Sequence, residues 1–255
     1  MRRTRRDAMK LGAGALAGAG LIGVMPWRAR AEGGDLYASD SGEIGIHPVS
    51  HASFVITAPG VTLYVDPVGD ASLYEGMPAP DAILITHEHG DHYQPDTLTA
   101  LPGEAPLLVN PAVSEMLPEG LAARATVLAN GESGEIAGVP VEAIPAYNTT
   151  EDRLQFHPEG RDNGYILSLD GMTIYIAGDT EDIPEMRALS GIDIAFVPMN
   201  LPYTMDVTQA ASAVAEFKPR VVYPYHYRGA DLDEFERKLS EASDASKVVR
   251  GPWYS

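Results

Sequence analysis

Short apolar segments of strand length recur along this chain and limit the folds that it can adopt. Pro59-Gly60 and Asp170-Gly171 each separate two such segments, and both dipeptides favour tight turns between antiparallel strands. A sequence with this many short strands buries its apolar faces best by packing sheet on sheet. The predicted strands are Glu43–His47, Ser53–Ala58, Thr62–Asp66, Ala82–Thr86, Leu107–Val109, Val139–Ile144, Tyr165–Leu169, Thr173–Ala177, Ile194–Val197 and Val221–Tyr223.

Helical periodicity is confined to a few segments that alternate with these strands. Pro95 is a suitable first residue for a helix that runs to Leu101. The segment DVTQAASAVAEFKP has apolar residues at helical spacing and stops before Pro219, and Leu232, Phe235 and Leu239 mark a closing helix. Strands followed by helices in two similar halves predict an α/β fold, an αββα sandwich of two packed mixed sheets with outer helices.

The charge of the chain excludes some partners. Its formal net charge is −18, and polyanions such as nucleic acids and anionic bilayers reward clustered lysine and arginine instead. We therefore expect no nucleic-acid partner. The chain has no cysteine, so disulfides cannot stabilise it. Its stability must come from packing, to which a bound metal can add.

The first 31 residues read as a targeting segment rather than as part of the fold. Five basic residues in MRRTRRDAMK precede the apolar run LGAGALAGAGLIGVM, and Ala29-Arg30-Ala31 offers a small-x-small cleavage site. Arg5 and Arg6 resemble a twin-arginine signal, which implies the twin-arginine export machinery and a periplasmic or secreted bacterial protein. An uncleaved anchor is the alternative, but the run is shorter than the roughly 20 residues that span a bilayer, so we expect no stable membrane insertion after cleavage.

Cleavage there would leave a domain of residues 32–255. The removed segment holds seven of the 18 basic residues and one of the 36 acidic ones, so the formal charge would fall to −24. A surface that acidic favours solubility and opposes contact with RNA.

The segment ILITHEHGDHY holds three of the chain's seven histidines and an aspartate within six residues. His87 and His89 are two residues apart, so their rings can face the same side, and Asp91 and His92 follow a turn that Gly90 permits. Imidazole nitrogen and carboxylate oxygen are ligands that borderline divalent metals accept. Four such groups are too many for one tetrahedral ion that keeps an open position, so the segment predicts two ions.

This H-x-H-x-D-H pattern resembles the metallo-β-lactamase superfamily of dinuclear metal hydrolases, in the branch near ascorbate-6-phosphate lactonase and N-acyl-phosphatidylethanolamine phospholipase D. The resemblance runs from Ile44 to Gly229 and implies the metallo-β-lactamase fold. It extends to Asp179 in a Gly-Asp-Thr triplet after one predicted strand, to His226 after another, and to His157 before a third. It implies that one ion is held by His87, His89, His157 and Asp179, and the other by Asp91, His92, Asp179 and His226.

Other residues are candidates for supporting roles. Asp66, in LYVDP, would orient a ligand histidine through its second ring nitrogen, although an aspartate before proline also suits a plain turn. His51 resembles a position that faces the metal centre in the same branch, with a structural role as the alternative. Polar residues that flank the ligands are candidates for substrate contact: Asn148, Arg161, Asn200, Tyr203 and Arg228.

The resemblance implies hydrolysis by a metal-bridging hydroxide, with Asp179 as the bridge and Asp91 orienting the nucleophile or taking its proton. Zn²⁺ is the expected metal, and Mn²⁺ or Fe²⁺ also suit such ligands. β-Lactamases of the superfamily lack the bridging aspartate, so a β-lactam is not expected. The resemblance implies a small-molecule substrate with an ester, lactone or phosphodiester bond. Two alternatives stay open, a catalytically idle metal- or ligand-binding module and an iron-dependent oxygenase on the same fold.

Overall fold

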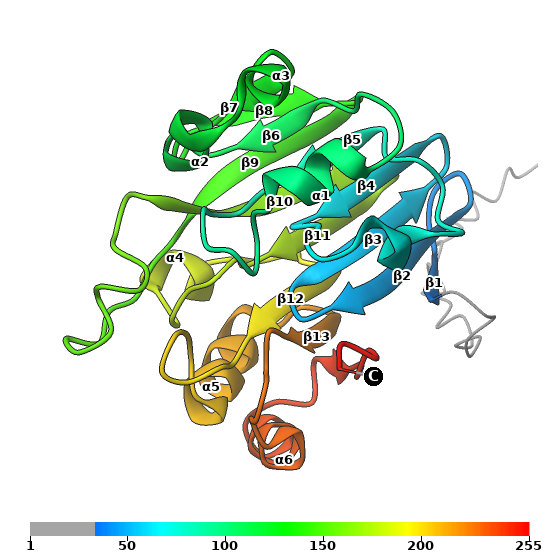
Figure 1. Cartoon of the computed structure of the whole chain (residues 1–255). Helices are drawn as coiled ribbons and strands as arrows, with labels where there is room; N and C mark the ends of the chain where they lie inside the picture. The colour runs from blue at the N-terminus through cyan, green and yellow to red at the C-terminus, as the bar shows by residue number, and fades with distance from the viewer. Residues whose placement is uncertain (1–33, 255) are drawn as a thin grey trace, which may run out of the picture.

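A computed structural model describes residues 34–254 (Figure 1). The predicted signal segment, residues 1–31, lies outside the described residues. Within residues 34–254, no helix combines the length and the apolar composition that a bilayer crossing requires.

Two seven-stranded sheets form the centre of the protein, and each is built from one continuous part of the chain. The strands of the first sheet are β1 (Asp35–Ala38), β2 (Glu43–Ser50), β3 (Ser53–Ala58), β4 (Val61–Val65), β5 (Ala82–Leu84), β6 (Leu107–Val109) and β7 (Ala125–Val127). They lie side by side in chain order, antiparallel from β1 to β4 and parallel from β4 to β7.

The second sheet repeats this arrangement. Its strands are β8 (Ser133–Ile136), β9 (Val139–Ala146), β10 (Asp162–Leu169), β11 (Met172–Ile176), β12 (Ile194–Pro198), β13 (Val221–Tyr225) and β14 (Lys247–Val248). Pairing is antiparallel from β8 to β11 and parallel from β11 to β14. Asp170 and Gly171 both have positive φ between β10 and β11, which is the turn geometry that their sequence predicts.

Helices cover the outer face of each sheet (Figure 1). Beside the first sheet lie η1 (Ala71–Tyr74), α1 (Pro95–Ala100), α2 (Pro111–Met116) and α3 (Glu119–Ala122), and beside the second lie α4 (Pro184–Arg187), α5 (Val207–Phe217) and α6 (Leu232–Ala242). The ends of α5 follow from its sequence. Asp206 and Gln209 form a reciprocal capping box at its start, and Lys218 ends it in a left-handed conformation before Pro219.

Strand alternation divides the core into three layers. Phe54 and Ile56 of β3 face the cluster between the two sheets, whereas Val55 faces the cluster under α1 to α3. In the same way Tyr175 of β11 faces the helices of the second sheet. Phe54 stacks on Phe196 of β12 with ring centroids 4.1 Å apart, which joins the sheets at their centre. The predicted α/β sandwich with outer helices is confirmed.

The polar candidates follow strands that end at one edge of the sandwich. Asp66 comes directly after β4, His87 shortly after β5, Asp179 after β11 and His226 directly after β13. Because parallel strands present their carboxyl ends at the same edge, these side chains converge there from both sheets. Elsewhere, strand β1 precedes Gly42 and was not among the predicted strands.

Candidate metal centre

The loop between β5 and α1 carries the histidine-rich segment. Its turn is closed by the backbone N–H groups of His92 and Tyr93, which both donate to the carbonyl of His89 at 2.9 and 2.8 Å. The turn does not require glycine at position 90, contrary to the prediction. Gly90 is not among the glycines with positive φ, and a Cβ there would meet no atom within 4 Å. Hydrogen bonds therefore shape the loop.

Asp66 fixes the start of this loop from behind. Its Oδ1 accepts the backbone N–H of Thr86 at 2.8 Å, and its Oδ2 accepts the Thr86 hydroxyl at 2.7 Å. The same Oδ2 lies 2.8 Å from Nδ1 of His92, and both side chains are fully buried. This contact leaves Nε2 of His92 free to face Asp179, which is the orienting role that the sequence predicts for Asp66.

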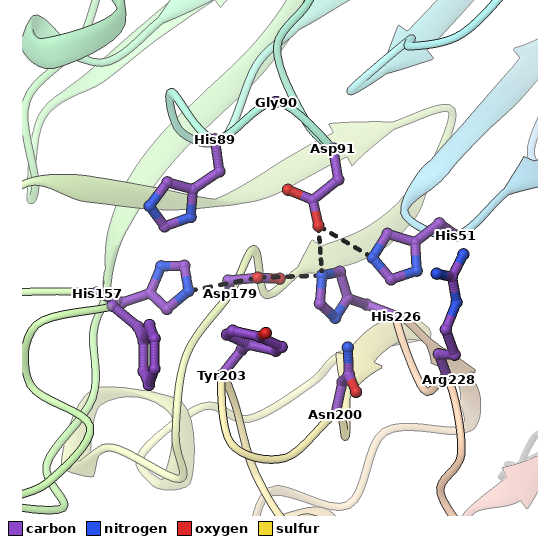
Figure 2. A pocket seen from close by; sticks show the side chains of 11 residues that line it. His51, His89, Gly90, Asp91, His157, Asp179, Asn200, Tyr203, His226 and Arg228 are labelled. Atoms are coloured by element: carbon purple, nitrogen blue, oxygen red, sulfur yellow. Dashed lines mark hydrogen bonds and ion pairs between the residues drawn. The ribbon is translucent and has the colours of Figure 1, made fainter.

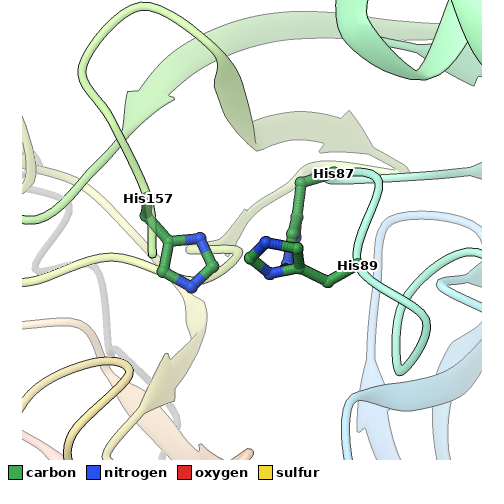
Figure 3. A group of neighbouring side chains, drawn as sticks. All are labelled: His87, His89 and His157. Atoms are coloured by element: carbon green, nitrogen blue, oxygen red, sulfur yellow. Dashed lines mark hydrogen bonds between the residues drawn. The ribbon is translucent and has the colours of Figure 1, made fainter. Parts of the chain in front are cut away.

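A first group of possible ligands consists of His87, His89 and His157, whose ligand nitrogens lie within 4.8 Å of one another (Figure 3). Nε2 of His87 is 3.1 Å from Nδ1 of His89. His157 reaches them from the loop between β9 and β10. Its Nδ1 is held 2.9 Å from Oδ2 of Asp162, which turns its Nε2 toward the group.

A second group consists of His51, Asp91 and His226. Oδ2 of Asp91 lies 3.1 Å from Nε2 of His51 and 3.4 Å from Nε2 of His226, and the two rings lie 3.9 Å apart. Both histidines have positive φ, at 52° and 46°, and the N–H of His226 donates to the carbonyl of His51 at 3.0 Å. Left-handed backbone is uncommon for histidine and is found where surrounding structure enforces it, often at functional sites.

Tyr254 fixes the orientation of His51. The Tyr254 oxygen accepts the backbone N–H groups of Tyr227 and Arg228 at 3.0 and 3.1 Å and lies 2.6 Å from Nδ1 of His51. Burial raises the pKa of Tyr254 to about 12, so its hydroxyl keeps its proton at neutral pH. With both lone pairs used, that proton goes to Nδ1, so a neutral His51 carries hydrogen on Nε2 and donates it to Asp91.

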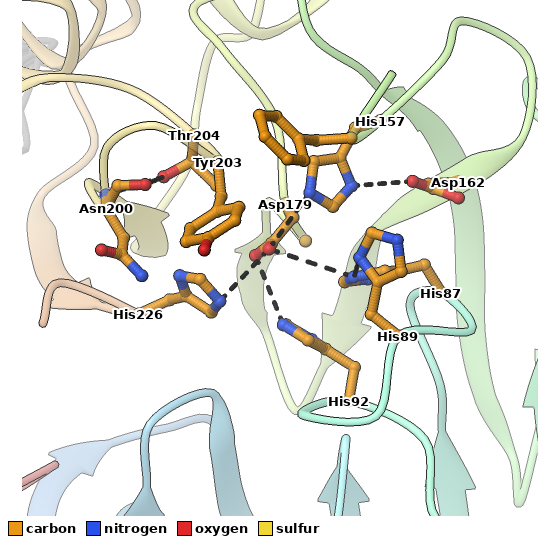
Figure 4. A network of polar contacts seen from close by, with 12 residues as sticks. His87, His89, His92, His157, Asp162, Asp179, Asn200, Tyr203, Thr204 and His226 are labelled. Atoms are coloured by element: carbon orange, nitrogen blue, oxygen red, sulfur yellow. Dashed lines mark hydrogen bonds and ion pairs between the residues drawn. The ribbon is translucent and has the colours of Figure 1, made fainter. Parts of the chain in front are cut away.

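Asp179 lies between His226 of the second group and the three histidines of the first group (Figure 4). Its Oδ2 is 3.2 Å from Nε2 of His226, 3.4 Å from Nε2 of His157 and 3.9 Å from Nε2 of His87. Its Oδ1 is 3.4 Å from Nε2 of His92. Gly178, with φ of 65°, makes the preceding turn, where a Cβ would lie 2.7 Å from the carbonyl oxygen of Asn163. One buried carboxylate thus faces four imidazoles.

Several of these buried atoms have no hydrogen-bond partner within residues 34–254. They are Oδ1 of Asp179, Nε2 of His92 and both ring nitrogens of His226. Buried polar atoms are nearly always satisfied, so this cluster indicates a missing partner. Ligands about 2.1 Å from a tetrahedral ion are about 3.4 Å apart, which matches the spacings around Asp179. The residues present therefore fit bound divalent metal.

The electrostatics favour the same conclusion. Burial alone would raise the pKa of Asp179, but neighbouring histidines outweigh it and hold that pKa well below its usual range. Burial lowers the pKa of His87 and of His89 below 6.5. Burial opposes protonation of His92 as well, yet Asp179 and Asp66 raise its pKa well above the usual value. Asp179 is therefore anionic and His87 and His89 are neutral, which are the metal-binding forms, while His92 must release a proton to bind.

Comparison with known proteins assigns the family. Residues 46–226 match the model of the Beta-lactamase superfamily domain. A metal-dependent hydrolase of Pyrococcus abyssi is 35% identical over 178 residues, which cover 66% of this chain and 77% of the relative. The chain belongs to the metallo-β-lactamase superfamily. A crystal structure of a candidate metal-dependent hydrolase from Parabacteroides distasonis is 42% identical, with a TM-score of 0.76 over 84% of this chain and 97% of that one.

This superfamily member is a metal-dependent hydrolase, like its relatives. CmlA, a diiron β-hydroxylase from Streptomyces venezuelae, is 18% identical with a TM-score of 0.62, covering 86% of this chain and 53% of its own. That likeness is one of fold alone.

The superfamily member has a pocket of about 670 Å³ in front of the two ligand groups (Figure 2). Of the predicted substrate contacts, Asn200, Tyr203 and Arg228 line it. The other two lie outside its lining and are occupied elsewhere. Asn148 is buried and donates to the carbonyls of Arg153 and Tyr203, and Arg161 binds Asp162, Glu88 and the carbonyl of Phe156.

Some residues of the site escaped the sequence analysis. Asp162, which orients His157, begins a strand after a long loop, and only its contact reveals its role. Buried Glu181 accepts hydrogen bonds from Thr149 and Thr150 and binds Arg153, which ties down the loop that carries His157. Tyr254 is far from His51 in sequence, and no motif marks it. The sequence signal that could have identified Glu181 is its position two residues after Asp179.

Proposed function

We propose that this hydrolase binds two divalent metal ions and cleaves an ester, lactone or phosphodiester bond in a small molecule. One ion would be held by His87, His89, His157 and Asp179, and the other by Asp91, His92, Asp179 and His226. Two such ions, when bound, supply Lewis acidity and lower the pKa of a water toward neutrality, which provides hydroxide without a strong protein base. We propose zinc, with manganese or iron as the alternatives that N and O ligands also accept.

The surroundings of Asp179 carry this proposal. Its Oδ2 lies near ring nitrogens of both groups, those of His157 and His226, and its Oδ1 faces His92. Its side chain is 3% exposed and has an unsatisfied oxygen. A carboxylate so placed would be a ligand shared by two ions, and a single ion would leave part of the cluster unsatisfied.

Asp91 is the acidic group with access to substrate. Its side chain is 50% exposed and lines the pocket. Burial would raise its pKa, but His226 and His51 hold the pKa well below its usual range, so it is a carboxylate at neutral pH. We propose that its Oδ2, steadied by His51, orients the attacking water and accepts a proton during turnover.

Asn200 and Tyr203 would act on the substrate from the opposite wall of the pocket. Tyr203 is 45% exposed, and its ring packs edge-on against Phe156 at 5.0 Å. An amide N–H and a phenolic O–H at these positions can donate to the oxygen on which charge develops. Because the chain has the bridging aspartate that β-lactamases of the superfamily lack, β-lactams are not the proposed substrate.

We also propose that residues 1–31 direct export through the twin-arginine route to the periplasm or beyond. Folded export would let the cytoplasm select the metal before the protein leaves. Fractionation of cells that express the full chain, with Arg5 and Arg6 changed to lysine as the comparison, tests this. Unchanged periplasmic recovery of that variant would contradict it.

The hydrolase proposal is tested by metal content and turnover together. Metal-loaded protein is assayed on a simple lactone, an aryl ester and an aryl phosphodiester. We expect two ions per chain and turnover of one class. Asp179→Ala should lower the rate by more than the 10- to 100-fold typical of residues that only orient ligands. Asp244→Ala is the control, because Asp244 is exposed and has no hydrogen bond or ion pair within residues 34–254.

Each alternative gives a different result. Two bound ions with equal, negligible rates for the wild type and Asp179→Ala would favour an idle binding module. Oxygen consumption by the iron-loaded protein, without hydrolysis, would favour the oxygenase. Full activity of Asp179→Ala would refute the bridging role.

A further inference from the structure

Arg228 lies at the rim of the pocket, and its guanidinium has no hydrogen-bond or ion-pair partner among residues 34–254. Of the eight arginines among residues 34–254, the other seven donate from their side chains to carboxylates or carbonyls. The guanidinium of Arg228 makes no hydrogen bond or ion pair within that range, although the chain has twice as many acidic as basic residues. An arginine without a carboxylate in so acidic a protein leaves five donors available to a ligand.

Contacts with Tyr254 fix the position of Arg228, although its guanidinium forms no ion pair within residues 34–254. Its backbone N–H donates to the Tyr254 oxygen at 3.1 Å, and its guanidinium carbon lies 5.6 Å from the centre of the Tyr254 ring. Tyr254 in turn contacts His51, so Arg228 belongs to the His51 side of the pocket (Figure 2). A guanidinium held over an aromatic ring is ready to bind an anion in a fixed direction.

The opposite side of the pocket is aromatic. Phe156 and Tyr203 both line it, and they lie beside His157 rather than His51. Asn148 donates to the carbonyl of Tyr203 and to that of Arg153, which holds together the two loops that carry the aromatic rings. The metal ligands, including Asp179 and His226, lie between this aromatic wall and Arg228.

We propose that Arg228 is an anion subsite, and that the substrate of the proposed hydrolase has a carboxylate or phosphate on one side of the scissile bond and an apolar group on the other. The anion accepts hydrogen bonds from the guanidinium, and the apolar group packs on Phe156 and Tyr203. The negative charge of the whole chain repels anions, so a dedicated cation at the rim is what admits them. This proposal rests on the proposed function and narrows its substrate class.

A matched pair of esters tests the subsite. 4-Nitrophenyl butyrate is neutral, and mono-4-nitrophenyl glutarate has the same ester with a free carboxylate. We expect wild-type protein to prefer the glutarate by about 10-fold in kcat/KM, the low end for a charged hydrogen bond because the rim is open to solvent. Arg228→Gln should abolish the preference, and it should lower glutarate turnover more than butyrate turnover. Arg220→Gln, at an exposed arginine that binds Asp193 outside the pocket, should keep it.

Two further measurements separate this inference from the hydrolase proposal. Raising the salt to about 0.5 M should weaken the glutarate preference and leave butyrate turnover unchanged, because exposed charges are screened. Calorimetry on the metal-loaded protein measures binding of glutarate and of inorganic phosphate directly, whether or not either ester is hydrolysed. Weaker binding of one anion in Arg228→Gln supports the subsite and identifies its anion. Equal preference and equal binding in wild type and variant overturn it while the hydrolase stands.

Discussion

Replacing Tyr254 by phenylalanine would remove a single oxygen atom on which three hydrogen bonds converge. Two of them come from the backbone N–H groups of Tyr227 and Arg228, and water can replace these because the group is partly exposed. The third, at 2.6 Å to His51, determines which nitrogen of that histidine carries hydrogen. We therefore expect a small loss of stability and a larger loss of activity.

The magnitudes follow from these contacts. A net contribution of about 1 kcal/mol for replaceable hydrogen bonds predicts a fall in Tm of about 2 to 4 °C for a chain of this size. Without the tyrosine, His51 can place hydrogen on Nδ1 and cease to donate to Asp91. Loss of such an orienting contact typically costs about 10- to 100-fold, and here it should lower kcat with little change in KM for a neutral ester.

The assay is steady-state hydrolysis of the neutral ester with thermal unfolding measured in parallel. Tyr227→Phe is the matched control, since its ring packs against Tyr254 at 4.8 Å but its hydroxyl makes no hydrogen bond within residues 34–254. A kcat within about twofold of wild type, together with the expected fall in Tm, would refute the orienting role. It would mean that the tilted packing of the His51 ring against His226 suffices to hold the ring.

Two other substitutions test separate parts of the structure. Asp66→Asn replaces an acceptor of the His92 ring by an amide, and we expect metal affinity to fall about 10- to 100-fold in competition with a chromophoric chelator; unchanged affinity would contradict the orienting role. Asp170→Asn tests acid stability: Ser39 and Ser41 hold the pKa of Asp170 below its usual 3.8, so its contribution is present above that value and is lost as pH falls through the lowered pKa. Between about pH 5 and pH 3, the Tm of the variant should fall less than the Tm of wild type. Curves of Tm against pH that run parallel for the two proteins would exclude the effect.

The sequence was informative about the interior of each sheet and uninformative about its margins. The strands missing from the prediction, β1, β7, β8 and β14, are the four edge strands of the two sheets. An edge strand has one backbone edge open to solvent, and its side chains need not alternate between apolar and polar. The exposed residues of β8 illustrate this. Helices α2, α3 and α4 span six, four and four residues, which is too short for a helical period to stand out.

The candidate ligands were predictable because each lies in a compact motif or directly after an apolar strand. Their supports were not, because the partners meet only in three dimensions. The pairing of His157 with Asp162 was within reach of local reasoning, whereas Tyr254 approaches His51 across 203 positions. Nor could the sequence separate Arg161, which is bound by Asp162 and Glu88, from Arg228, whose guanidinium pairs with no carboxylate in the part of the chain that the structure describes.

The order of strands gives the protein the character of two fused subunits. Each sheet is formed by one continuous segment of the chain, and residues 128–132 connect the two segments. A chain break within 128–132 would therefore separate no two strands that pair with each other. The candidate metal centre draws on both parts, with His51, His87, His89, Asp91 and His92 before the break and His157, Asp179 and His226 after it. Two polypeptides divided at this point would each lack a complete centre, and metal uptake would report their reassembly.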